Sequence, residues 1–146
     1  MPIRKVINKQ LGEVLVEHNA ISQQQLDKAL AFQKENGGLI GEILVELGFL
    51  REEDIAQALT VQYGFPYLPL SNYEINPEII GIIPRSIADK YAFIPIDKIG
   101  NSLTLVMYNP LIEKAVEEAE RVSGCNVQVF VSTLSDIRKA ITKYYK

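Results

Sequence analysis

Two short segments, Leu11-Gly12-Glu13 and Ile40-Gly41-Glu42, have residue types that could bind an anion. A glycine at the start of a helix permits close backbone approach and leaves amide groups at the positive end of the helix dipole, where phosphates bind. Two such ends would suit a ligand with two phosphates. Alternatively, the two glycines only let neighbouring helices pack tightly, and the residue pattern leaves both interpretations open.

The side chains that usually carry catalysis are few and lack partners. His18 is the only histidine and Cys125 the only cysteine, so triad chemistry, an intramolecular disulfide and a thiolate zinc cage are not expected. The phosphate-binding patterns GxxxxGK[ST] and GxGxxG do not occur. We therefore predict a non-catalytic module with no catalytic residues and no metal site.

The composition is that of an ordinary soluble domain. Of 146 residues, 47% are hydrophobic and 23% charged, and the net charge is −3. The chain has no long run of Lys or Arg, so we expect no nucleic-acid binding. It also has no signal-peptide core and no apolar run near the roughly 20 residues of a spanning helix. We therefore expect a cytoplasmic protein without direct membrane insertion.

An internal repeat is the most informative feature of the chain. Residues 10–33 align without gaps on residues 39–62, at a constant offset of 29. Eight aligned positions are identical: Gly12/Gly41, Glu13/Glu42, Leu15/Leu44, Val16/Val45, Glu17/Glu46, Ala29/Ala58, Leu30/Leu59 and Gln33/Gln62. The apolar spacing in each copy predicts a helix, a turn and a second helix, so four short helices should pack as two related hairpins.

Local signals place the ends of these helices. Ser22 is a candidate N-cap in the first copy, and Gly48 is well placed just after the first helix of the second copy. The acidic run 52–54 favours a helix start there, because carboxylates stabilise the N-terminal end of the helix dipole. The apolar stripe of the second helix of the first copy is predicted to be Leu26, Ala29, Leu30 and Gln33.

The remainder of the chain predicts a small α/β unit. Residues 65–77 contain three prolines and should run extended over the surface, with short helices starting near Pro77 and after Pro84. Two strands joined by a turn at 100–102, a helix over 111–124 that ends at Gly124, a third strand over 126–132 and a terminal helix capped by Thr133 or Ser135 follow.

The predicted fold class is therefore α+β. It consists of duplicated helical hairpins followed by a ββαβα unit whose three-stranded sheet carries its helices on one face. We place the boundaries at a duplicated helical subdomain (1–64), a Pro-rich crossing with short helices (65–91) and the ββαβα subdomain (92–146).

Several segments resemble one known family. They are the doubled LGEVLVE and IGEILVE units, the YGFPYLPL crossing, the Pro84-Arg85 helix start, the LTLVMYNP strand and the closing IRKAITKYY. Their order and spacing resemble the N-terminal domain of type II secretion and type IV pilus assembly ATPases, whose ligand-binding variants are called MshEN domains. The resemblance covers about residues 8–145 and is specific, because five separate segments match in order.

The resemblance implies a cytoplasmic domain, peripheral to the inner membrane, that precedes a hexameric ATPase domain and docks onto the cytoplasmic domain of an inner-membrane platform protein. In some members this domain binds cyclic di-GMP, and no other cofactor is implied. The positions that correspond to ligand-binding positions are Gln10, Leu11, Gly12, Leu26, Leu30 and Gln33 in the first copy, and Leu39, Ile40, Gly41, Ile55, Leu59 and Gln62 in the second.

The chain departs from the binding members at two of these positions. Gln10 and Leu39 stand where binding members have arginine. A guanidinium stacks on bases and donates charge-assisted hydrogen bonds, which Gln does only in part and Leu not at all. Each lost contact would cost about 1.5–3 kcal/mol. We therefore expect a protein-docking domain first and a cyclic di-GMP receptor second.

Overall fold

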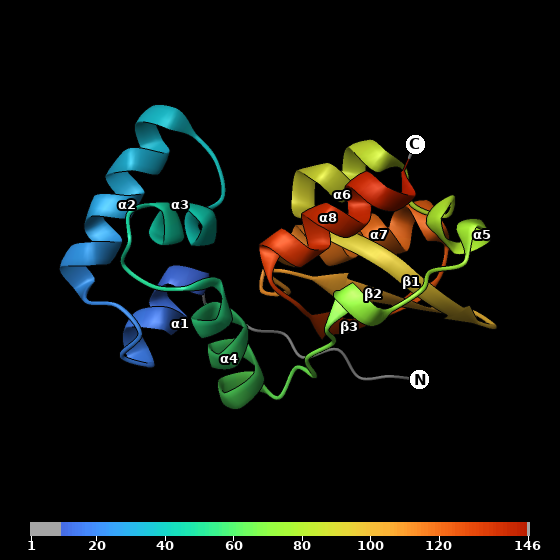
Figure 1. The fold of residues 1–146 in the computed structure, drawn as a ribbon, viewed down its shortest axis with the longest axis horizontal. Coiled ribbons are helices and arrows are strands. Elements are labelled where there is room, and N and C mark those ends of the chain that lie inside the picture. The colour runs from blue at the N-terminus through green and yellow to red at the C-terminus, as the bar shows by residue number, and fades with distance from the viewer. Residues whose placement is uncertain (1–9, 146) are drawn as a thin grey trace.

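The computed structural model describes residues 10–145, and the element order matches the predicted one (Figure 1). The helical part holds four helices, and three short helical segments, a pair of strands, a helix, a third strand and a final helix follow. The bounds are α1 (Leu11–Glu17), α2 (Gln23–Asn36), α3 (Ile40–Glu46), α4 (Glu52–Tyr63), η1 (Leu70–Asn72), α5 (Pro77–Ile80), α6 (Arg85–Tyr91), β1 (Phe93–Ile99), β2 (Ser102–Met107), α7 (Glu113–Ser123), β3 (Asn126–Val131) and α8 (Leu134–Tyr144).

The backbone confirms the duplication. The helices α1 and α3 begin and end at positions exactly 29 residues apart, and α2 and α4 begin with the same offset. After α1 the chain turns through Asn19 with φ 60°, and after α3 it turns through Gly48 with φ 78°. In each copy this residue donates its N–H three residues back, to Val16 and Val45 respectively, at 3.0 Å. The two hairpins therefore share one turn, although only the second has the glycine that this turn favours.

The predicted caps are present. The hydroxyl of Ser22 accepts the N–H of Gln25, and the Gln25 side chain accepts the N–H of Ser22, which forms a capping box for α2. Gly124 ends α7 in the left-handed conformation. Of the two alternatives for α8, Thr133 is the N-cap, because its hydroxyl accepts the N–H of Asp136.

The Pro-rich crossing differs from the prediction in part. It is not extended throughout, because η1 interrupts it and buries Leu70. Its first half pairs with the sheet: the Leu68 N–H donates to the carbonyl of Val131 at 3.0 Å, and the Val131 N–H donates to Pro66 at 2.8 Å. The crossing is thus anchored to the edge of β3. The helix predicted over 111–124 also starts later, at Glu113.

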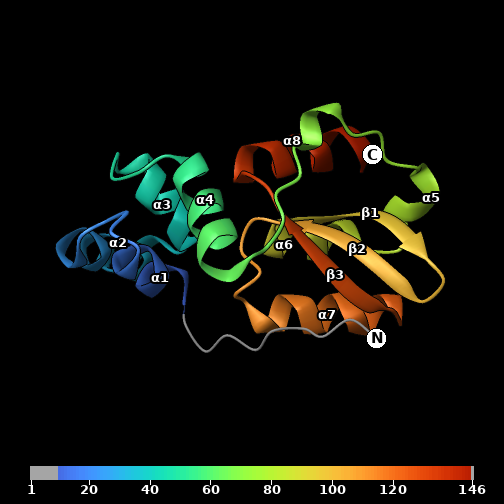
Figure 2. The same cartoon turned by 90° about the horizontal axis from the view of Figure 1, so that it is seen from below.

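The sheet has the order β1-β2-β3, with β1 and β2 antiparallel and β2 and β3 parallel. The parallel pair is connected through α7, as parallel strands require a crossover. In Figure 1 the helices α6, α7 and α8 lie above the sheet, and α6 contacts both of the others. In the view of Figure 2, α8 lies above the three strands and α7 lies below them. The four repeat helices, α1 to α4, lie beyond one end of the sheet.

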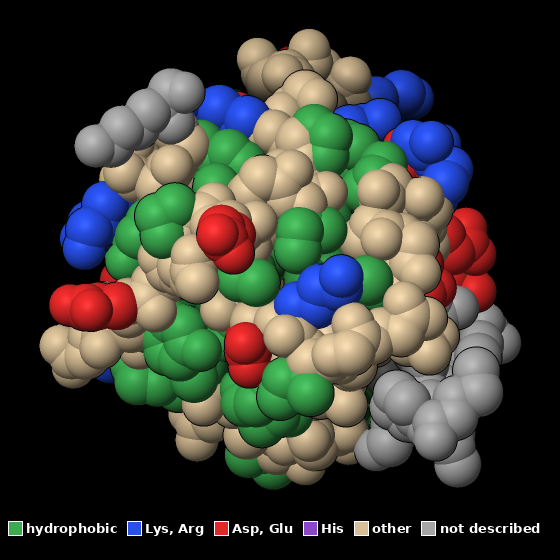
Figure 3. All heavy atoms as spheres, turned by 90° about the vertical axis from the view of Figure 1, so that its right-hand side faces the viewer, with side chains coloured by type: hydrophobic (Ala, Val, Ile, Leu, Met, Phe, Trp, Pro, Cys, Tyr) green, Lys and Arg blue, Asp and Glu red, His purple; other side chains and the backbone are tan. Residues whose placement is uncertain are grey.

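The α/β unit has a continuous apolar core under its helices. The first four residues of β1 and the last three of β2 are buried in succession, and Leu103 in β2 and Val131 in β3 are fully buried. On the face shown in Figure 3, apolar side chains lie among separate acidic and basic side chains. In the part of the chain that the structure describes, no helix is both long and apolar enough to span a bilayer.

The two copies of the repeat are buried unequally. Ala29 and Ala58 are both fully buried at equivalent positions. Leu30, however, is 41% exposed, whereas its counterpart Leu59 is 0% exposed. The predicted apolar stripe is therefore part of the core at Leu59, whereas at Leu30 it reaches the surface.

Candidate functional site

A groove of about 390 Å³ runs along the first copy of the repeat, and we call it the first-repeat groove. It brings together eight of the twelve predicted ligand-binding residues, six from the first copy and two from the start of the second. Its lining consists of Gln10, Leu11, Gly12, Glu13, Leu26, Leu30, Gln33, Gly38, Leu39, Ile40, Tyr108, Asn109, Leu111 and Ile112.

The walls of this groove are mostly apolar. Besides the Glu13 carboxylate and the Tyr108 hydroxyl, its polar side chains are the amides of Gln10, Gln33 and Asn109, and Asn109 is 4% exposed. The Asn109 Oδ1 accepts the N–H of Leu111 at 3.1 Å, and the Gln33 side chain donates to the carbonyl of Gly38 at 2.9 Å. Of the described residues that line the groove, Glu13 is the only charged one. The groove can therefore hold an apolar group beside a donor of hydrogen bonds, and its charge favours a cation.

A second cavity, of about 250 Å³, lies at the second copy, and we call it the second-repeat cavity. Of the predicted residues it contains Gly41 and Ile55, whereas Leu59 is buried elsewhere and Gln62 is exposed. Its full lining is Gly41, Glu42, Val45, Glu46, Glu52, Ile55, Tyr108, Ser132, Thr133, Leu134, Ser135 and Arg138. The twelve predicted residues thus divide between two sites, with two of them outside both.

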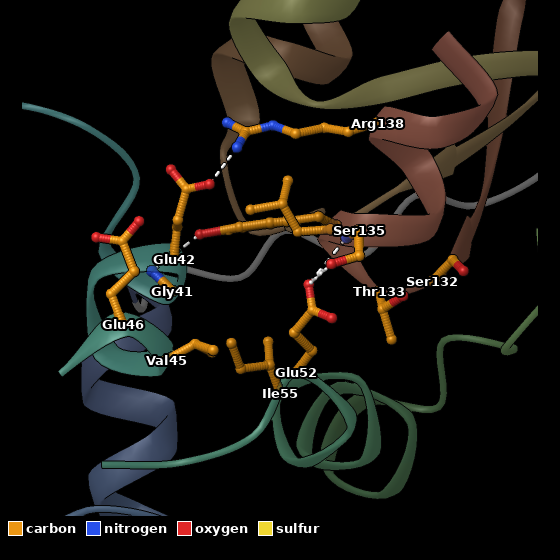
Figure 4. Close-up of a pocket in the computed structure, with 12 residues that line it drawn as sticks. Gly41, Glu42, Val45, Glu46, Glu52, Ile55, Ser132, Thr133, Ser135 and Arg138 are labelled. Carbon is orange, nitrogen blue, oxygen red and sulfur yellow. Dashed lines mark hydrogen bonds and ion pairs between the residues drawn. The ribbon is translucent and has the colours of Figure 1, made fainter. Parts of the chain in front are cut away.

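Tyr108 lines both the groove and the cavity. Its hydroxyl accepts the N–H of Gly41 at 3.0 Å in a buried hydrogen bond (Figure 4). Burial raises the pKa of Tyr108 to about 12, and the nearby Glu42 carboxylate acts in the same direction, whereas the hydrogen bond from Gly41 opposes it. The start of the second copy is therefore occupied by a neutral hydroxyl of the same chain.

Two polar contacts join the second copy to α8 around this cavity. The Arg138 guanidinium forms an ion pair with the Glu42 carboxylate. The Glu52 carboxylate accepts both the N–H and the hydroxyl of Ser135, each at 2.8 Å. Figure 4 shows these residues facing one another across the cavity. The second copy is thus held to the α/β unit by three separate polar connections, counting Tyr108.

Both repeat glycines are tightly packed. A Cβ added to Gly41 would lie 2.7 Å from the Tyr108 hydroxyl oxygen and 3.1 Å from Cδ1 of Ile55. A Cβ added to Gly12 would lie 2.5 Å from Cδ1 of Leu26. The interpretation that these glycines permit close packing accounts for both positions. The interpretation that they receive an anion remains a prediction.

The residues at the two arginine positions are placed together. Gln10 and Leu39 both line the first-repeat groove, and neither Lys nor Arg occurs among its lining residues in the described range 10–145. In the same range, no group of three His, Cys, Asp or Glu side chains is arranged to hold a metal ion. His18 is half-buried and Cys125 is buried. These side chains lie outside both sites.

The residues of these sites that sequence reasoning did not assign to a ligand include Tyr108, Asn109, Ser135 and Arg138. They are far from the repeat in sequence, since Tyr108 is 67 residues from Gly41 and Arg138 is 96 residues from Glu42. The available signals were the LTLVMYNP segment, which contains Tyr108 and Asn109, and the IRKAITKYY segment, which contains Arg138.

Comparison with known proteins agrees with this architecture. A family model described as the MshEN domain matches residues 63–146. The type IV pilus assembly ATPase PilB of Myxococcus xanthus is 38% identical over 135 residues, which are 92% of this chain and 24% of that protein. The chain therefore spans about a quarter of the length of this curated relative.

Two solved structures match almost the whole chain. The structure of MshE with cdg is 27% identical, has a TM-score of 0.71, and the match covers 94% of this chain and 100% of that one. The N-terminal domain of XpsE is 21% identical and has a TM-score of 0.77, with both chains covered completely, which shows the common fold. The chain belongs to the MshEN domain family, and it has the α+β fold of the N-terminal domain of secretion and pilus assembly ATPases.

Proposed function

We propose that this chain is a non-catalytic docking domain that regulates a secretion or pilus assembly ATPase by binding the cytoplasmic domain of an inner-membrane platform protein. The observation that carries this proposal is the first-repeat groove, which is mostly apolar, open to solvent at Leu30, and, among residues 10–145, charged only through Glu13. Exposed apolar surface with a polar rim is typical of protein interaction sites. The domain would then act at the cytoplasmic face of the membrane, beside the ATPase domain of the same machine.

The charges of the two sites favour a protein partner over a dianionic nucleotide. Among the described residues, the lining of the second-repeat cavity contains the carboxylates of Glu42, Glu46 and Glu52 but one cation, Arg138, which is already paired with Glu42. The groove adds the carboxylate of Glu13. Two phosphates brought to either site would meet like charges and would lack the arginines that normally receive them.

Binding of the purified platform domain to the immobilised chain tests this proposal. We expect saturable binding that weakens at least about tenfold in Leu30→Asp, because a buried contact of this size is worth about 1.4 kcal/mol or more. Val61→Asp is the matched control, since Val61 is an exposed apolar residue of α4 outside the groove. Absence of binding by the unaltered chain would contradict the proposal. An ATPase assay on this chain should give a flat trace.

The second candidate is a cyclic di-GMP receptor. It is favoured by the gathering of eight motif positions in one groove and by the similarity to MshE, whose structure was solved with cdg. A thermal-shift titration tests it. The docking proposal predicts no shift with the unaltered chain and a gain of binding when Gln10→Arg and Leu39→Arg are combined. A shift in the unaltered chain that is abolished by Gly12→Glu or Leu30→Asp would establish the receptor instead.

A further inference from the structure

The same face of the repeat is used differently in the two copies. In the second copy this face is covered from within the chain: the Tyr108 ring lies over Gly41, and Arg138 pairs with Glu42. In the first copy the counterparts, Gly12 and Glu13, line the first-repeat groove instead. The contacts of the second copy therefore indicate that this face of the repeat can bind a phenol ring and a guanidinium group.

We propose that the first-repeat groove binds a partner polypeptide that presents an aromatic side chain next to an arginine, in the manner of Tyr108 and Arg138 at the second copy. This inference rests on the proposed docking function and specifies its contact surface. The internal contact serves as its template, and three properties of the groove agree with it.

The apolar part of the groove fits an aromatic ring. Leu26 in the groove corresponds to Ile55 in the cavity, where Ile55 and Tyr108 both lie around Gly41. Leu30 is 41% exposed and extends this apolar wall. An aromatic side chain buries about 150–250 Å² and supplies much of the binding energy at protein interfaces. A ring inserted here would cover the leucine that the α/β unit leaves exposed.

The charge of the groove fits an arginine. Glu13 corresponds to Glu42, which pairs with Arg138 in the second copy. Among residues 10–145, no ion pair or side-chain hydrogen bond involves Glu13, and its side chain is exposed at the edge of the groove. Arginine suits this position better than lysine, because its planar guanidinium can donate two hydrogen bonds to one carboxylate.

Asn109 provides a donor for a peptide backbone. Its Oδ1 accepts the N–H of Leu111, whereas within the described range its Nδ2 group has no partner. The side chain is more than nine-tenths buried and lines the groove. The Nδ2 atom is not among the fully buried side-chain polar atoms without a partner in the described residues, so it is accessible from the groove and can donate to a carbonyl of a bound segment. This favours a polypeptide over an isolated apolar ligand.

Fragment titrations followed by NMR on the isotope-labelled full chain test the inference. We use p-cresol as the tyrosine side chain, ethylguanidinium as the arginine side chain, and toluene as a ring without a hydroxyl. We expect p-cresol to shift the methyl signals of Leu26 and Leu30 at roughly millimolar affinity, with toluene weaker. Ethylguanidinium should shift the Glu13 side chain. The Gly41 amide should not respond, because Tyr108 already occupies it.

Variants locate the binding. Leu30→Asp should abolish the p-cresol shifts, Glu13→Gln should abolish the guanidinium shift, and Val61→Asp should leave both unchanged. Tyr108→Ala, checked for a folded spectrum, opens the second copy and should make the Gly41 amide respond to p-cresol. Should that variant not fold, the Leu30 and Glu13 variants still decide the outcome in the unaltered background.

Each result bears on one claim. If p-cresol and ethylguanidinium leave Leu26, Leu30 and Glu13 unshifted, the inference is overturned, even where the platform domain still binds and the docking proposal stands. If the fragments bind but the platform domain does not, the groove assignment holds and the platform assignment fails. If cyclic di-GMP shifts the groove signals and the fragments do not, the occupant is a nucleotide and the inference is wrong.

Discussion

The hydrogen bond between Gly41 and Tyr108 gives the sharpest test of how the second copy is held. Tyr108→Phe keeps the ring and removes only the hydroxyl that accepts the Gly41 N–H at 3.0 Å. The net loss of one hydrogen bond is about 0.5–1.5 kcal/mol, and a buried N–H left without a partner costs about 1–3 kcal/mol. We therefore expect the free energy of unfolding to fall by about 1–3 kcal/mol.

Two measurements check this expectation together. Urea unfolding gives the change in free energy, and hydrogen exchange of the Gly41 amide reports the contact itself, which should exchange about tenfold faster for each 1.4 kcal/mol lost. Tyr145→Phe is the control, because the Tyr145 hydroxyl donates to the carbonyl of Ile83 at 2.9 Å in another part of the fold. It should lower stability without a selective change at Gly41.

The reasoning would be refuted if Tyr108→Phe changed neither quantity. Unaltered stability with unaltered exchange at Gly41 would mean that the hydroxyl does not occupy the start of the second copy in solution. Equal acceleration at Gly41 in both tyrosine variants would mean that the amide responds only to global stability. Either result would remove the template on which the proposed occupant of the groove is based.

The same contacts give further expectations. Burial raises the folded-state pKa of Tyr108 from its ordinary value of 10 to about 12. The contribution of Tyr108 to stability is therefore fully present below pH 10 and is lost as the pH rises towards 12. In this range the unfolding free energy of the unaltered chain should fall more than that of Tyr108→Phe, by up to about 2–3 kcal/mol. In a denaturant titration, Gly41→Ala should lower the unfolding free energy by about 1–3 kcal/mol, because the new Cβ meets the fixed Tyr108 side chain. Gly12→Ala should lower it less, because the flexible end of Leu26 can move into the groove. Equal losses in the two variants would contradict the asymmetry between the copies. Gly48→Ala should lower the unfolding free energy by about 1–2 kcal/mol, because φ is 78° at this position. Asn19→Gly should leave stability unchanged or raise it, because φ is 60° there and glycine adopts this conformation without strain. A melting temperature that rises in Gly48→Ala and falls in Asn19→Gly would show that the two turns differ.

The repeat helices could be predicted because their signals are local. The offset of 29 residues fixes both copies at once, and Ser22 and Gly124 mark helix ends through contacts within a few residues. The hairpin turn predicted at 100–102, which the structure limits to residues 100–101 because Ser102 begins β2, and the Thr133 cap have the same local character. The order of elements in the α/β unit followed from such signals together with strand and helix periodicity.

The asymmetry between the copies could not be predicted, because it depends on where the α/β unit packs. Leu30 and Leu59 are identical residues at equivalent positions, so nothing in their neighbourhood distinguishes the exposed one from the buried one. The partners of the second copy are just as distant: Ser135 lies 83 residues from Glu52. The interruption of the crossing by η1 also has a tertiary cause, since it buries Leu70 against the core.

The exposed groove of the first copy is proposed to receive a protein and not a cyclic dinucleotide. Calorimetric titration of one preparation of the full chain, first with cyclic di-GMP and then with the cytoplasmic domain of the platform protein, tests this claim most directly. We predict no heat of binding with the nucleotide and saturable heat with the protein that Leu30→Asp removes. Saturable nucleotide binding at micromolar or tighter affinity, with none for the protein, would contradict the account.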